Sequence, residues 1–88
     1  MAMWGLNVEQ VKSLATQMDT KAGDIDNILS ALTSQLESTE WEGPDSTKFR
    51  SDWNGQYTNA LRQISQALKD TANRARQNAA EQEQASNS

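Results

Sequence analysis

A Trp-x-Gly triplet, Trp41-Glu42-Gly43, lies almost at the midpoint of the 88 residues and is followed at once by Pro44, the only proline. Both flanking segments have the three- and four-residue spacing of apolar side chains that is typical of amphipathic helices. Proline cannot sit inside a helix without removing a hydrogen bond, and glycine lets the backbone turn without a Cβ clash. The chain therefore has to reverse here, and we expect a turn over residues 39–44 between two long helices.

The segment before the triplet carries one continuous apolar stripe. With Val8 and Ile28 included, the stripe is about 160° wide at roughly 100° per residue, which is wider than contact with one neighbouring helix requires. Asn7, followed three residues later by Gln10, resembles a helix capping box. We predict a first helix over residues 7–38, about 48 Å long at 1.5 Å per residue. Its stripe consists of Val11, Leu14, Met18, Ala22, Ile25, Leu29, Leu32 and Leu36.

The segment after the triplet predicts a second helix over residues 45–80. Pro44 suits the start of a helix, and Asp45 faces the positive end of the helix dipole. The apolar side chains shrink to alanine toward the far end, and residues 81–88 lack any large apolar residue, which predicts a disordered tail. The large members of this stripe are Phe49, Trp53, Tyr57, Leu61, Ile64 and Leu68.

Two long helices joined by a short turn are antiparallel neighbours, so the sequence predicts an all-α helical hairpin forming a single domain over residues 1–80. A hairpin of this size has a thin core, and each stripe is covered on one side only. We therefore expect two hairpins to associate into a four-helix bundle. The large apolar residues of both stripes would form the core of the hairpin or of the dimer. The second hairpin could be another copy or a related chain.

The charge pattern agrees with close pairing of the two halves. Residues 1–44 contain seven acidic residues against two lysines, whereas residues 45–88 contain six basic residues against five acidic ones. Three cations, Arg62, Lys69 and Arg74, project from one side of the second helix. A nucleic-acid or lipid surface is one interpretation, but pairing with the acidic first helix is favoured, because a net charge of -4 does not suit a polyanionic partner.

The residue inventory argues against an enzyme and against a metal or cofactor site. The chain has no histidine and no cysteine, which removes the usual nucleophile–base pairs and zinc ligands. No glycine-rich phosphate loop is present. No apolar run approaches the ~20 residues of a transmembrane helix, and the start lacks the pattern of a signal peptide, so we expect no stable membrane insertion.

Trp41 has two interpretations. The indole could plug the end of the hairpin by packing on Leu36 or Phe49, or it could be an exposed recognition handle at the tip of the turn. Physical reasoning alone favours the plug.

Two amphipathic helices around a central Trp41-x-Gly43 resemble the WXG family, the early-secreted-antigen-like substrates of type VII (Esx) secretion systems. The resemblance covers nearly the whole chain, and the run from Trp41 to Trp53 looks like actinobacterial members in particular. It implies hairpins that pair as homodimers or heterodimers and that a secretion ATPase exports folded, without a cleaved signal peptide. Such a protein is cytoplasmic before export and then extracellular or bound to the cell envelope.

The family's second signal, Tyr-x-x-x-Asp or Tyr-x-x-x-Glu after the second helix, does not occur here. The only tyrosine is Tyr57, and Leu61 stands four residues later. The resemblance therefore implies either a substrate that depends on a partner's signal or, as the alternative, a cytoplasmic adaptor or chaperone hairpin that pairs with a larger secreted effector or toxin. We favour the substrate, as a homodimer slightly over a dimer with a paralogous WXG-family chain. The expected secretion motif is Trp41 with Gly43.

Overall fold

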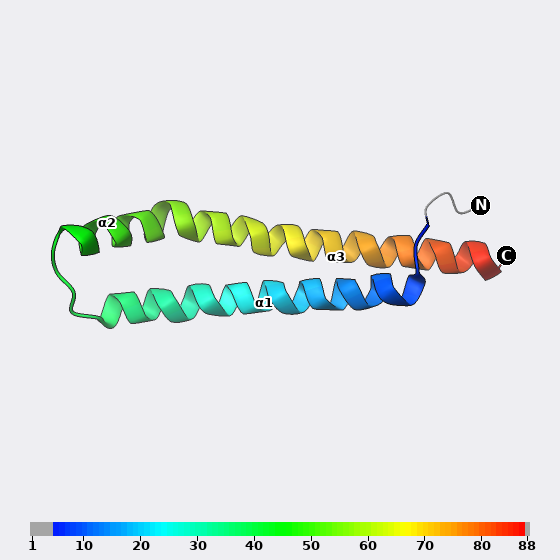
Figure 1. The fold of residues 1–88 in the computed structure, drawn as a ribbon, viewed down its shortest axis with the longest axis horizontal. Helices are drawn as coiled ribbons and strands as arrows, with labels where there is room; N and C mark the ends of the chain where they lie inside the picture. Colours follow the sequence, from blue (N-terminus) through cyan, green and yellow to red (C-terminus); the bar gives the residue numbers. More distant parts are fainter. Residues whose placement is uncertain (1–4, 88) are drawn as a thin grey trace.

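The computed structural model describes residues 5–87, which form a long helical hairpin (Figure 1). One arm is a single helix, and the other runs antiparallel to it as three consecutive helical segments. The overall dimensions of the hairpin are 65 × 18 × 13 Å. The predicted all-α hairpin is confirmed. The elements are α1 (Val8–Ser38), α2 (Pro44–Asp52), the π-helical turn η1 (Trp53–Tyr57) and α3 (Thr58–Asn87).

Helix α1 begins and ends where local side chains and backbone satisfy its free polar groups. The Asn7 side-chain oxygen accepts a 3.0 Å hydrogen bond from the backbone N–H of Gln10, as an N-cap residue does. At the other end Thr39 is extended, and its N–H reaches the carbonyl of Leu36. Pro44 opens α2 directly after Gly43, whose φ of 125° is one that only glycine adopts easily.

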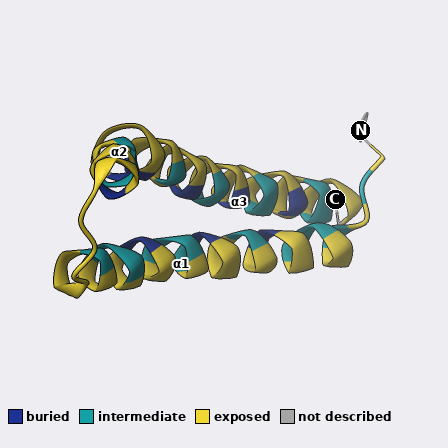
Figure 2. Cartoon of the chain, turned by 60° about the vertical axis from the view of Figure 1, so that its left-hand side comes forward, coloured by how far each residue is buried: buried dark blue, intermediate teal, exposed yellow. Residues whose placement is uncertain are grey.

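Small residues form the seam along which α1 and α3 meet. Figure 2 shows the buried positions on the facing sides of the two helices. They recur every seven residues, which is the spacing of a coiled-coil seam. The four alanines among them have 0% exposure, so the two backbones approach closely. The seam consists of Ala15, Ala22 and Leu29 on α1 and of Thr58, Ser65, Ala72 and Ala79 on α3.

The centre of the predicted stripe is displaced from this seam. Leu14 is 52% exposed, and Tyr57 and Ile64 are also exposed, so they lie outside the hairpin's own core. Ile28, at 55%, lies on the same side of α1 as Leu14. We call Leu14, Ile28, Tyr57 and Ile64 the apolar face. Of the other predicted core residues, Leu29 and Trp53 are buried, and those half-buried are Val11, Met18, Ile25, Leu32, Leu36, Phe49, Leu61 and Leu68.

The turn η1 interrupts what the sequence predicted as one uninterrupted helix. The carbonyl of Trp53 accepts both the backbone N–H of Thr58, five residues on, and its side-chain hydroxyl. A π-type turn holds one residue more than an α-turn. Ser46 and Trp53 are buried seven residues apart, but the next buried position is Thr58. The extra residue therefore lets both α2 and α3 keep their buried sides toward α1.

Helix α3 continues to Asn87, beyond the end near residue 80 that the sequence predicted. Residues 81–87 of the expected disordered tail are helical, and Ser88 lies outside the described residues. Within this added length, the Glu83 carboxylate lies 2.9 Å from the ammonium of Lys12 on α1.

Three cross-helix ion pairs line one side of the hairpin. Lys12 pairs with Glu83, Asp19 with Arg76, and Asp26 with Lys69. Each step of seven residues forward along α1 is matched by a step of seven backward along α3. We call the surface that carries them the ladder face. Residues two apart on a helix project about 200° from each other, so Lys12 and Asp26 lie on the side of α1 opposite to the Leu14 and Ile28 of the apolar face.

The ion pair at Asp26 makes the stability of the hairpin depend on pH in the acidic range. Hydrogen bonds from Lys69 and Ser65 lower the pKa of Asp26 below its ordinary value of 3.8. A lowered carboxyl pKa in the folded state gives stability that is present above pH 3.8 and is lost as the pH falls through the folded-state pKa.

We therefore expect Asp26→Asn to melt at a lower temperature than the wild type at pH 7, with the gap narrowing as the pH falls below 3.8. Thermal melts followed by circular dichroism across this range measure the effect. Asp24→Asn is the control, because within residues 5–87 the Asp24 carboxylate pairs only with Lys21 on its own helix, at 3.9 Å. A gap that stays constant with pH would show that Asp26 acts through packing and not through its charge.

Candidate functional site

The turn between the helices is held by its backbone and by one small buried side chain. Ser46 is 2% exposed, and its hydroxyl donates a 2.6 Å hydrogen bond to the carbonyl of Trp41. The backbone N–H and the hydroxyl of Thr47 both reach the carbonyl of Gly43, at 3.0 and 3.1 Å. These contacts attach the Trp-x-Gly segment to the first turn of α2.

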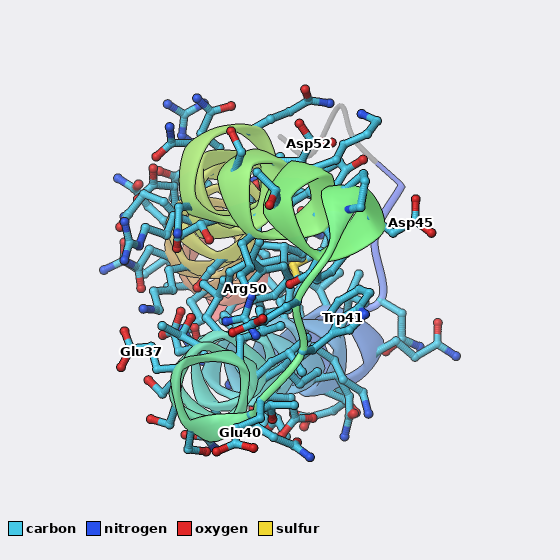
Figure 3. The ribbon with its side chains drawn as sticks, turned by 90° about the vertical axis from the view of Figure 1, so that its left-hand side faces the viewer. Glu37, Glu40, Trp41, Asp45, Arg50 and Asp52 are labelled. Carbon is cyan, nitrogen blue, oxygen red and sulfur yellow. The ribbon has the colours of Figure 1, made fainter. Side chains whose placement is uncertain are left out.

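Arg50 connects the two ends of the hairpin turn. Its guanidinium donates to the carbonyl of Leu36 near the end of α1 and, at 2.9 Å, to the carbonyl of Thr39. Its Nε–H also donates to the Ser46 hydroxyl at 2.8 Å. Figure 3 shows Arg50 between the ends of the two arms. A cation at a helix C-terminus satisfies free carbonyls and the negative end of the helix dipole. Arg50 thus binds α1, the turn and α2 into one unit.

The ring of Trp41 is partly exposed. Its exposed fraction is 43%, and within residues 5–87 its indole N–H has no acceptor. The structural contribution of Trp41 comes from its carbonyl, which accepts from the Ser46 hydroxyl, and Arg50 in turn donates to Ser46. The favoured sequence interpretation made the ring itself the plug, whereas in the structure part of the indole and its N–H stay available to a partner.

An aromatic cluster lies behind the turn, over α2 and η1. Phe49 stacks on Trp53 with ring centroids 6.1 Å apart and contacts Tyr57 at 6.3 Å. The buried Trp53 donates its indole N–H to the hydroxyl of Thr33 on α1 at 2.9 Å. Such pairs add stability beyond their buried area, so the aromatic cluster strengthens the thin core near the tip of the hairpin.

The tip is also acidic. Glu37, Glu40 and Asp45 point outward around the turn in Figure 3, and all three are exposed. Among the described residues, none of them forms an ion pair. Residues 5–87 contain no group of three or more acidic side chains placed to hold a metal ion. The tip can therefore offer an indole and negative charge to a protein partner.

Comparison with known proteins supplies a family for this arrangement. Residues 6–86 match the WXG100 family, described as proteins of 100 residues with WXG. The chain belongs to this family. No curated protein and no solved structure matches it. The match spans both arms of the hairpin and the turn that carries Trp41 and Gly43. In the part of the chain that the structure describes, no helix is long and apolar enough to span a bilayer.

The Arg50 network is the part of this site that sequence reasoning missed. Arg50 lies 14 residues from Leu36 and 11 from Thr39, and no short motif links the three. Its only signal is position, since a cation one turn into the second helix of a tight hairpin lies near the free carbonyls of the first.

Proposed function

We propose that this chain is a non-enzymatic substrate of type VII (Esx) secretion that acts through protein–protein contacts as a dimer. Membership of the WXG100 family supports the link to this secretion system. Trp41 carries the proposal, because its indole is partly exposed on a turn that Ser46 and Arg50 hold rigidly. The protein would be cytoplasmic before export and then extracellular or in the cell envelope, without a cleaved signal peptide.

The apolar face supports pairing with a second hairpin. Leu14, Ile28, Tyr57 and Ile64 are exposed on one side of a narrow molecule, and half-buried residues such as Leu32 flank them. Covering this face with another hairpin would complete a four-helix bundle. We favour a second copy over a paralogous WXG-family chain, because the acidic first half of one copy can face the more basic second half of another.

In this proposal Trp41 and Gly43 form one part of a composite export signal that the secretion ATPase recognises. Neither copy of a homodimer carries the Tyr-x-x-x-Asp/Glu part, because Tyr57 begins no such signal and lies in η1. A homodimer would therefore need a further chain to supply this part, whereas a paralogous WXG-family partner could carry it and place the two parts on one surface.

Trp41→Ala tests the proposal. We expect ~10–30-fold less protein in the culture supernatant of the native host, which is the effect of losing an aromatic anchor worth ~2 kcal/mol. Helicity should change little, because the Trp41 carbonyl remains available to Ser46. Glu42→Ala, which alters the neighbouring exposed side chain, is the matched control. Unchanged export of the Trp41 variant would show that the indole is not recognised.

The rival function is a cytoplasmic adaptor or chaperone that pairs with a larger secreted effector or toxin. The missing Tyr-x-x-x-Asp/Glu sequence favours it. Comparing lysate and supernatant with and without the secretion ATPase separates the two functions. A substrate leaves the cell only when the ATPase is present, whereas an adaptor stays in the lysate in both strains.

A further inference from the structure

The ladder face has a fourth position that lacks an acid. One further step of seven from Asp26 reaches Thr33, and the matching step back from Lys69 reaches Arg62. Both residues line the same open groove between α1 and α3, which has a volume of about 410 Å³. The groove's other lining residues are Asp26, Leu29, Ser30 and Ser34.

Arg62 forms no ion pair within the described residues, and the carboxylate that also lines the groove, Asp26, is already paired with Lys69. The Thr33 hydroxyl opposite it already accepts the Trp53 indole N–H. Among residues 5–87, Arg62 and Arg74 are the two cations without a hydrogen bond or ion pair, and of these only Arg62 lines the groove. A guanidinium beside three hydroxyl groups offers a carboxylate several hydrogen-bond donors at once.

The groove stays open when the apolar face is covered. Arg62 lies two residues before Ile64 on α3, so the two side chains project from opposite sides of that helix. A second hairpin packed on Ile64 would leave Arg62 facing solvent. A contact at the groove is therefore independent of the proposed dimer and could be made by a dimeric or a single hairpin.

We propose that the groove at Arg62 binds an Asp or Glu side chain of a partner protein that lies across the ladder face. The three complete rungs show that this face pairs each cation with one carboxylate. One guanidinium balances one negative charge, whereas a phosphate dianion would leave excess charge on a chain that already carries -4. The wall formed by Leu29, whose exposed fraction is only 7%, suits the methylene groups of a carboxylic side chain and not a free ion.

The test follows the Arg62 Nε–H by NMR in the full chain, at constant ionic strength with chloride as the balancing ion. The probe is an alanine-rich helical peptide with one central glutamate, and the same peptide with glutamine is its control. We expect a saturable shift with the glutamate peptide at ~10-fold lower concentration than with free acetate, because the peptide also contacts the groove wall. The glutamine peptide should give no saturable shift.

Arg74 is the matched internal control, since it is unpaired but lies outside the groove. Equal responses at Arg62 and Arg74 would overturn the proposal, because they would indicate non-specific attraction. Tighter binding of inorganic phosphate than of the peptide would also overturn it, as would saturation by acetate and peptide at the same concentration. Because export is not measured, the result does not depend on whether the proposed secretion function holds.

A second variant supplies the missing carboxylate from within the chain. In Thr33→Glu the new carboxylate can accept from both Trp53 and Arg62, so we expect peptide binding to be abolished and the melting temperature to rise by ~2–4 °C. Thr33→Gln has the same size without the charge and should still bind the glutamate peptide. Retained binding in Thr33→Glu would show that Arg62 is not the group that binds the peptide carboxylate.

Discussion

Replacing Ile28 with aspartate is expected to turn the proposed dimer into folded or partly folded monomers. Ile28 is 55% exposed in the hairpin, so the substitution costs little within one chain. In the four-helix bundle both copies would bury an unpaired carboxylate, at several kcal/mol each. The dissociation constant should rise at least ~1,000-fold, which corresponds to ~4 kcal/mol. Light scattering should give about twice the 9.8 kDa chain mass for the wild type and the single mass for the variant.

Thr16→Asp is the control, because Thr16 is exposed on the same helix and lies two residues from Leu14, which places it on the side opposite to the apolar face. It adds the same charge and should leave the proposed dimer intact. Leu29→Asp is the opposite extreme, since Leu29 is buried in the hairpin seam, and it should abolish helicity and association together. A wild type that stays a folded monomer at low micromolar concentration would refute the bundle.

The hairpin itself was predictable because its two signals are local. The spacing of apolar residues predicts helices, and Gly43 with Pro44 predicts the turn. The Asn7 cap could also be recognised, because the N-cap contact spans only three residues. These features depend on sequence neighbours, for which periodicity and residue type carry the relevant physics.

The seam was not predictable from the same pattern. The predicted stripe contained Ala22 and Leu29 of the seam but not Ala15, and its large side chains shift its centre toward Leu14, which is exposed. The spacing of apolar residues gives the side of a helix that is most hydrophobic on average. It does not distinguish between the different neighbours that this side contacts. A stripe that serves both an internal seam and an external face has its centre between them. The excess width of the first stripe was the sign that a second surface exists.

The turn η1 and the Arg50 network depend on contacts that no spacing rule contains. One extra residue between Trp53 and Thr58 is invisible in a sequence whose residues all favour or tolerate helix. The ladder face is different, since its sequence signal was present. Lys12, Asp19 and Asp26 recur every seven residues, as do Lys69, Arg76 and Glu83. The sequence interpretation used the total charges of the two halves and did not use this spacing.

Arg50→Ala should release the turn while the arms stay paired. The variant loses the donors to Leu36, Thr39 and Ser46. Hydrogen bonds from a charged group are worth ~1.5–3 kcal/mol each, and because these three act as one unit we expect a total loss of ~2–3 kcal/mol. Hydrogen exchange should accelerate over residues 36–47 and change little around Ala22, in the middle of α1.

Comparing Arg50→Ala with two other variants separates the effect of the geometry of the turn from the effect of overall stability. Lys48→Ala removes only an exposed pair with Asp52, 2.9 Å away on the same helix, and should lower stability little without altering exchange in the turn. Arg50→Lys keeps the charge but cannot form the three-way fork, so exchange in the turn should be intermediate. If Trp41 is recognised through the geometry of the turn, export should fall as hydrogen exchange in the turn becomes faster. Export should then be highest for Lys48→Ala, intermediate for Arg50→Lys and lowest for Arg50→Ala, although the indole is present in every variant. Wild-type export of Arg50→Ala despite rapid exchange in the turn would mean that the secretion ATPase orders the segment itself, and that the rigidity given by Arg50 serves the fold alone.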